Sequence, residues 1–140
     1  MYMERVLADS GFVVALMNRS DQRHADVSPI YKQYAQILLP QMVLVEVAYL
    51  IGRDAGISTV VEFLKGLPAS RFEVIEASAQ DLERTAQILE QYADSKVDFV
   101  DAIVMAIAER LNITAILTID QRDFRLFRPS HCESFTLRPQ

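Results

Sequence analysis

The sequence predicts an α/β protein: a single-domain α/β/α sandwich whose mainly parallel central sheet has four or five strands. Short apolar runs that stop at polar or turn residues alternate along the chain with longer amphipathic segments. Such alternation is typical of right-handed β-α-β crossovers, in which helices cover both faces of a parallel sheet. The chain has 140 residues, 51% of them hydrophobic, with only four glycines and five prolines, so we expect one domain over residues 1–140.

The first half of the chain contains two predicted strands, each followed by helices. An apolar run stops at Asp9, and a second one is closed by Pro40. Helical spacing of apolar residues fills the segments between and after them. The expected elements are a strand over 5–8, helices over 12–17 and 27–35, a strand over 37–39, and helices over 41–53 and 58–67.

The second half repeats this pattern. Residues 72–76 alternate as a strand does, Ser78 and Asp81 have the spacing of a helix start, and Asn112 is placed to end a strongly apolar helix. The expected elements are a strand over 72–76, helices over 79–92 and 98–111, a strand over 114–118 and a last short strand over 134–137.

Charge and cysteine content exclude several classes of protein. Fourteen Lys and Arg against nineteen Asp and Glu give a net charge of −5, which argues against holding polyanions by bulk charge, so any nucleic-acid contact must be local. Cys132 is the single cysteine, and no Cys/His cluster has the spacing of a structural zinc site. No apolar run approaches the roughly 18 residues of a membrane span, so we expect a cytoplasmic protein without membrane association.

Four acidic residues stand at positions that suggest chemistry. Asp9 and Asp120 follow predicted strands, and the carboxyl ends of parallel strands share one edge of the sheet, where ligands bind. Glu46 lies in an apolar helix, where a carboxylate is costly to bury without a cation, and Asp101 lies near the start of another. We therefore expect these four acids to meet.

Each acid also has a purely structural explanation. Asp9 could cap the following helix, Asp120 could be a turn residue, and capping is the better account of one member of the pair Asp98 and Asp101. For Glu46 the structural alternative is an ion pair with an arginine. The candidate partners are Arg53 and Arg110.

If the four acids converge, their repulsion raises their pKa values and destabilises the fold unless a divalent cation lies between them. Oxygen ligands without Cys or His favour Mg²⁺ or Mn²⁺ over Zn²⁺. Such an ion can activate a water for hydrolysis of a phosphodiester bond. Ser10 and Thr118 stand beside two of the acids and are placed to hold a ligand or water, or are simply turn and strand hydroxyls.

Basic residues fall in two groups near these acids. One group follows the helix after Asp9 and the other follows Asp120, so both could rim one cleft and hold phosphates on either side of the cut. Any one of them could equally be an exposed, solubilising arginine. The candidates for binding the phosphates of a nucleic acid are Arg19, Arg23, Arg122, Arg125 and Arg128.

Four motifs together resemble the PIN-domain family and, within it, the VapC-like ribonuclease toxins. They read Leu-Ala-Asp-Ser at 7–10, Leu-Val-Glu-Val at 44–47, Asp-Phe-Val-Asp-Ala at 98–102 and Thr-Ile-Asp-Gln-Arg-Asp-Phe at 118–124. Gly11 departs mildly from the first motif, where a hydroxyl or amide residue is more usual, which puts one supporting contact in doubt.

The resemblance implies an endoribonuclease that uses Mg²⁺ or Mn²⁺, acts on an RNA substrate, forms homodimers and is bound by a cognate antitoxin protein. It assigns catalysis and metal binding to Asp9, Glu46, Asp101 and Asp120, with Asp98 and Asp123 as further candidate metal ligands.

Two other functions remain open at this point. A receiver-type signalling domain shares the small parallel sheet but needs a lysine after a late strand, and none of Lys32, Lys65 and Lys96 follows a predicted strand end as required. A non-catalytic PIN-like module would keep the acidic cup only for structure or docking. The complete set of four acids favours the enzyme.

Overall fold

The computed structural model describes residues 3–140 and contains a five-stranded sheet in which every strand pairing is parallel. The strands are β1 (Val6–Ala8), β2 (Ile37–Pro40), β3 (Phe72–Ile75), β4 (Ala115–Leu117) and β5 (Thr136–Arg138). The helices are α1 (Ser10–Met17), α2 (His24–Gln33), α3 (Gln41–Ala55), α4 (Ile57–Gly66), α5 (Ala79–Gln91), α6 (Phe99–Leu111) and α7 (Arg122–Leu126). Short 3₁₀ turns lie at η1 (Leu67–Ala69) and η2 (Ala93–Ser95).

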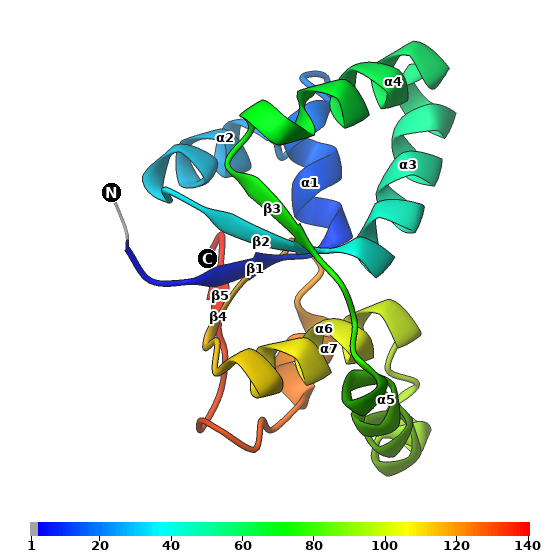
Figure 1. Ribbon diagram of the computed structural model, residues 1–140, viewed down its shortest axis with the longest axis vertical. Coiled ribbons are helices and arrows are strands. Elements are labelled where there is room, and N and C mark those ends of the chain that lie inside the picture. Colours follow the sequence, from blue (N-terminus) through cyan, green and yellow to red (C-terminus); the bar gives the residue numbers. More distant parts are fainter. Residues whose placement is uncertain (1–2) are drawn as a thin grey trace.

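The strands are ordered β3-β2-β1-β4-β5 across the sheet. Helices α1 to α4 lie on one side of the sheet and α5 to α7 on the other (Figure 1). This is the α/β/α sandwich predicted from the sequence. A receiver domain has the order β2-β1-β3-β4-β5 instead, so the signalling alternative is wrong.

Burial explains why the predicted strands are found. All residues of β1, β2 and β4 are buried, as expected for central parallel strands that helices cover on both faces. β3 lies at an edge, where Phe72 is buried but Glu73 and Val74 are exposed. Residues 102–108 of α6 are all buried, because this helix lies between the sheet and α5.

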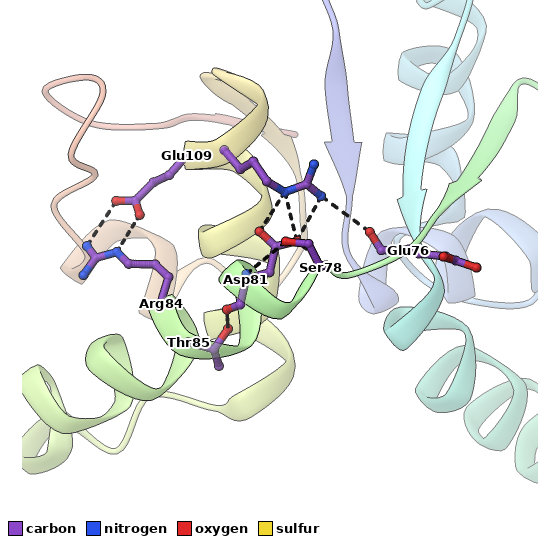
Figure 2. Close-up of polar contacts among 7 residues, drawn as sticks. Glu76, Ser78, Asp81, Arg84, Thr85 and Glu109 are labelled. Carbon is purple, nitrogen blue, oxygen red and sulfur yellow. Dashed lines mark hydrogen bonds and ion pairs between the residues drawn. The ribbon is translucent and has the colours of Figure 1, made fainter.

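Two ion pairs fasten α5 to α6 on the outer side of this layer (Figure 2). Arg84 Nε lies 2.7 Å from Glu109 Oε1, and Arg110 Nε lies 2.9 Å from Asp81 Oδ1. Burial opposes ionisation of Asp81, but hydrogen bonds from Arg110 and the Ser78 backbone outweigh it and lower the pKa of the Asp81 carboxyl. Asp81 and Ser78 also form the predicted capping box of α5. These two ion pairs hold α6 in place, and the two candidate acids Asp98 and Asp101 lie at the start of that helix.

Most element boundaries differ from the prediction by one or two residues, and three differences need an explanation. Helix α2 begins at His24, three residues earlier than expected, because its first turn is polar and shows no apolar periodicity. The five-residue helix α7 was not expected, since it is too short for a periodic pattern. The last strand is Thr136–Arg138 rather than 134–137.

None of the helices described over residues 3–140 is both long and apolar enough to cross a membrane.

Candidate active site

The site lies where the order of the sheet changes direction. The chain builds β1, β2 and β3 outward in one direction and then returns to place β4 on the other side of β1. In open parallel sheets, ligands bind beyond the carboxyl ends of the strands at such a point. Asp9 directly follows β1, and its backbone N–H donates to the carbonyl of Leu117 at the end of β4, 2.9 Å away. Asp120 follows β4 after two intervening residues.

A cavity of about 350 Å³ opens at this edge, and all six candidate acids line it. They come from the ends of β1 and β4, from α3, and from the starts of α6 and α7. The full lining is Asp9, Ser10, Gly11, Glu46, Leu50, Asp98, Asp101, Asp120 and Asp123. Segments spread over more than a hundred residues of sequence therefore share one acidic pocket.

Asp9 is the most deeply buried of the quartet, with 4% of its surface exposed. Its Oδ2 accepts a hydrogen bond from Thr118 Oγ1 at 3.2 Å, while its Oδ1 is buried with no hydrogen-bond partner among the described residues. Asp9 occupies the N-cap position of α1, but its side chain makes no capping bond, so the capping alternative is wrong. Burial, aided by the negative charge of Glu46, raises the pKa of Asp9 from 3.8 to about 6, against opposing hydrogen bonds from Ser10, Asp101 and Thr118.

Asp98 and Asp101 have different roles although they are three residues apart. Asp98 caps α6: its Oδ2 accepts from the backbone N–H of Val100 at 3.0 Å and of Asp101 at 3.3 Å. Asp101 makes no such bond. Burial, the charge of Asp9 and the contacts with Asp123 raise the pKa of Asp101 to about 10. Asp101 is therefore held against like charges, which is costly unless a proton or a cation intervenes.

Glu46 is half-buried and accepts a hydrogen bond from the Ser10 hydroxyl. The proposed ion pair is wrong, because Arg53 pairs with Asp54 and Arg110 with Asp81. The expectation that apolar residues bury Glu46 is also wrong.

The neighbours of Glu46 explain that error. Val45 is 76% and Tyr49 66% exposed, so part of the apolar surface of α3 faces outward instead of into the core. An apolar sequence around an acid does not reveal which of its neighbours are buried.

Asp120 and Asp123 complete the far wall of the cavity. Thr118 Oγ1 lies 3.2 Å from the backbone carbonyl of Asp120 as well as from Asp9, so one buried hydroxyl joins the ends of both strands. Asp123 is buried, accepts from the backbone N–H of Asp98 at 3.0 Å, and pairs with Arg122 at 2.8 Å. The Asp123 carboxylate is thus already bound by the Asp98 backbone and by Arg122, whereas the Asp120 carboxylate is exposed to the cavity.

The donor set suits a hard divalent cation better than a zinc ion, because it consists of carboxylates and hydroxyls. Within residues 3–140, no three His, Cys, Asp or Glu side chains are close enough together to form a complete metal site. Asp9 and Asp101, however, lie within hydrogen-bonding reach of each other, and Asp9 Oδ1 lacks a donor. Mg²⁺ is commonly held by one or two carboxylates and several waters, so this pair and the surrounding acids fit it.

The structure brings three of the five candidate arginines together. Arg23, Arg122 and Arg125 line a second cavity of about 360 Å³ beside the acidic one. Arg128 is turned away onto the carbonyls of Arg125 and Phe127, and Arg19 is exposed and lines neither cavity. The expectation of one rim built from all five is therefore wrong.

No role was predicted for Gln121 from the sequence. Its amide nitrogen donates to the carbonyls of Thr118 at 3.1 Å and Pro139 at 2.6 Å, which ties the β4–α7 loop to the C-terminal segment. Its position in a turn between the candidate acids Asp120 and Asp123 could have indicated a role in holding this loop. Tyr49 and Phe99, which are 66% and 42% exposed, also had no predicted role.

Comparisons with known proteins identify the fold and the family of this chain. The chain is 27% identical over 135 residues to ribonuclease VapC26 of Mycobacterium tuberculosis, an alignment that covers 96% of this chain and 100% of the relative. Among solved structures it resembles VapC20 of M. tuberculosis, a sarcin-ricin loop cleaving toxin, with a TM-score of 0.76, 22% identity and coverage of 83% of this chain and 90% of that one. It also resembles VapBC2 of Rickettsia felis bound to a promoter DNA fragment, with a TM-score of 0.69, 15% identity and coverage of 96% and 97%.

These likenesses confirm the expected resemblance to VapC-like proteins. The family description "PIN domain" matches residues 6–128, which include every candidate acid. The chain belongs to the PIN domain family.

Proposed function

We propose that the protein is an endoribonuclease dependent on Mg²⁺ or Mn²⁺ and the toxin of a VapBC-type toxin–antitoxin pair. The observation that carries this proposal is the acidic cavity at the junction of β1 and β4, where the buried Asp9 faces the half-buried Asp101. The likeness to a ribonuclease, VapC26, over nearly the whole chain supports RNA as the substrate.

In this proposal, Asp9 and Asp101 would hold the metal ion. Glu46 and Asp120 would complete the acidic cavity around it, and Asp98 and Asp123 would support them. When bound, the ion would lower the pKa of a water and offset negative charge on the phosphate oxygens.

The surrounding residues keep the acids in position. Thr118 holds Asp9, and the Ser10 hydroxyl holds Glu46. The carboxylates of Glu46 and Asp120 line the same cavity and would accept hydrogen bonds from the attacking water, which would orient it toward the phosphorus.

The test is RNA cleavage by purified protein with Mg²⁺, with Mn²⁺ and with EDTA, compared among the wild type, Asp9→Asn and Asp101→Asn. We expect cleavage only with metal, at least a hundredfold slower in both variants, and products with 5′-phosphate and 3′-hydroxyl ends. The matched control is Asp54→Asn, because Asp54 is exposed at the end of α3 and away from the cavity. Equal cleavage by the wild type and both site variants would refute the assignment, and intact RNA with normal Mg²⁺ binding would favour the non-catalytic module.

We also propose a cognate antitoxin as partner, since the structural neighbours include a VapBC pair bound to DNA. The measurement is cleavage in the presence of a small protein encoded beside this one. We expect a stoichiometric complex without cleavage, and an uninhibited enzyme with that protein would contradict the pairing.

For the homodimer we propose an exposed apolar patch of α3 and α6, formed by Val45, Tyr49 and Phe99, which are 76%, 66% and 42% exposed. These residues and their neighbours line a cavity of about 410 Å³ whose only acidic member is Glu46. An apolar surface with little charge suits an identical surface on a second copy better than it suits phosphates.

Light scattering after size exclusion tests the dimer. We expect a wild-type dimer and a monomer for the double variant Val45→Lys with Tyr49→Lys. Leu64→Lys, on another exposed apolar position in α4, is the control and should remain dimeric. A wild-type protein that stays monomeric at all concentrations would contradict the proposed homodimer.

A further inference from the structure

The acidic cavity and the second cavity are both lined by residues of the segment 119–125. Within the segment 119–125, Asp120 and Asp123 line the acidic cavity, whereas Gln121, Arg122 and Arg125 line the basic one. The ion pair between Arg122 and Asp123 crosses from one cavity to the other. A linear polyanion that occupies the acidic cavity can therefore extend along this segment to the basic one.

The three arginines differ in how firmly their charges are already engaged. Arg122 pairs with Asp123, a buried acid, and also donates to the carbonyl of Ser95 at 2.7 Å, so its guanidinium is committed. Arg23 pairs with Asp26, but these side chains are 42% and 54% exposed, and exposed pairs are weak enough to exchange for another anion.

Arg125 has no acidic partner among residues 3–140, and its guanidinium donates a hydrogen bond to the neutral side-chain oxygen of Gln121 at 2.8 Å. Both donor hydrogens of the Gln121 amide are used by the carbonyls of Thr118 and Pro139, which fixes the oxygen that faces Arg125. The guanidinium of Arg125 is therefore oriented before any ligand arrives, and a preorganised planar fork suits phosphate oxygens.

We infer that this basic cavity binds a backbone phosphate of RNA, next to the phosphodiester that lies over the acidic cavity, through Arg125 and Arg23. The inference rests on the proposed ribonuclease function and adds the site that holds the flanking strand. Because the contact is to phosphate, it is independent of base sequence and positions the strand. It also explains how a chain with a net charge of −5 can hold RNA locally.

The test is the salt dependence of binding, measured by fluorescence anisotropy with a labelled single-stranded RNA in EDTA so that no cleavage occurs. Each phosphate contact with a single strand contributes about 0.7 to the slope of log affinity against log salt. We expect Arg125→Gln and Arg23→Gln each to reduce the slope by about that amount and the low-salt affinity by roughly tenfold. Lys65→Gln, the same change of charge on exposed α4, should alter neither.

Two further measurements separate the possible outcomes. Unchanged thermal melting by circular dichroism shows that the variants fold, and an unchanged slope in folded Arg125→Gln overturns the inference. Displacement of RNA by micromolar inorganic phosphate would assign the cavity to a free anion instead, which also overturns it. Since binding is measured without metal, RNA that binds as expected but is never cut would count against the proposed function alone.

Discussion

Replacing Asp9 by asparagine should make the metal-free protein more stable at alkaline pH. The Asp9 carboxyl is 4% exposed, its Oδ1 has no hydrogen-bond partner among the described residues, and burial raises its pKa from 3.8 to about 6. The folded state thus binds this proton more tightly than the unfolded state does. Its contribution to stability is present in full below pH 3.8 and is lost as the pH rises through 6.

The size of the effect follows from the shift. About two pKa units at 1.36 kcal/mol each give about 3 kcal/mol in all, of which about 1 kcal/mol is lost between pH 5 and pH 8. Asp101, with its pKa raised to about 10, adds a loss of the same sign. Asp81 and Glu109, whose pKa values are lowered, lose their contribution only in more acidic solution and do not interfere in this window.

The assay is urea unfolding in EDTA, followed by circular dichroism because the chain has no tryptophan. We expect the free energy of unfolding of the wild type to fall between pH 5 and pH 8 by about 1 kcal/mol more than that of Asp9→Asn. Saturating Mg²⁺ should restore the wild type by about 2.7 kcal/mol at a hundredfold excess over its Kd and leave the variant unchanged. The reasoning is refuted if both proteins have the same pH dependence in EDTA.

Two other substitutions test how the site and its support are built. Thr118→Val removes the hydroxyl that bonds Asp9 while keeping the side-chain shape, so we expect RNA cleavage to slow at least tenfold with the fold intact, and unchanged kcat would contradict a positioning role. Arg84→Met leaves the largely buried Glu109 without its ion-pair partner, so we expect the free energy of unfolding to fall by about 2 kcal/mol. Arg53→Met removes an exposed ion pair and should lower the free energy of unfolding by less than about 1 kcal/mol. An equal loss of unfolding free energy in both variants would show that the Arg84–Glu109 ion pair does not stabilise the fold.

The sequence was sufficient for the sheet and for predicting that the candidate acids meet at one edge of it. Apolar runs identified all five strands, and the rule that parallel strands end at one edge placed Asp9 and Asp120 together without any knowledge of distances. Capping chemistry was visible as well, because Asp98 and Ser78 stand directly before helices that they cap. These features depend on local order along the chain.

Features that depend on the orientation of side chains could not be predicted. The burial of Glu46 was overestimated, since an apolar run does not reveal that Val45 and Tyr49 point outward. Likewise, five arginines flank the acids in sequence, but the turn geometry that directs Arg125 into the cavity and Arg128 onto backbone carbonyls is set by tertiary contacts. Helix α7 was missed for the same reason, because one short turn is fixed by its surroundings rather than by periodicity.

Helix α6 explains how the fold tolerates a destabilising site. Its residues 102–108 are wholly buried and its far end is clasped to α5 by two ion pairs, so its position is determined away from the cavity. Asp98 then satisfies the free amides of the first turn, which leaves Asp101 available to face Asp9. Asp98 caps the helix and Asp101 faces Asp9, so α6 keeps its N-terminal cap whether or not a cation occupies the acidic cavity. The repulsion between Asp101 and Asp9 is therefore offset by the buried contacts and ion pairs that stabilise the rest of α6. A cation that binds between these two acids relieves the repulsion without any rearrangement of the core.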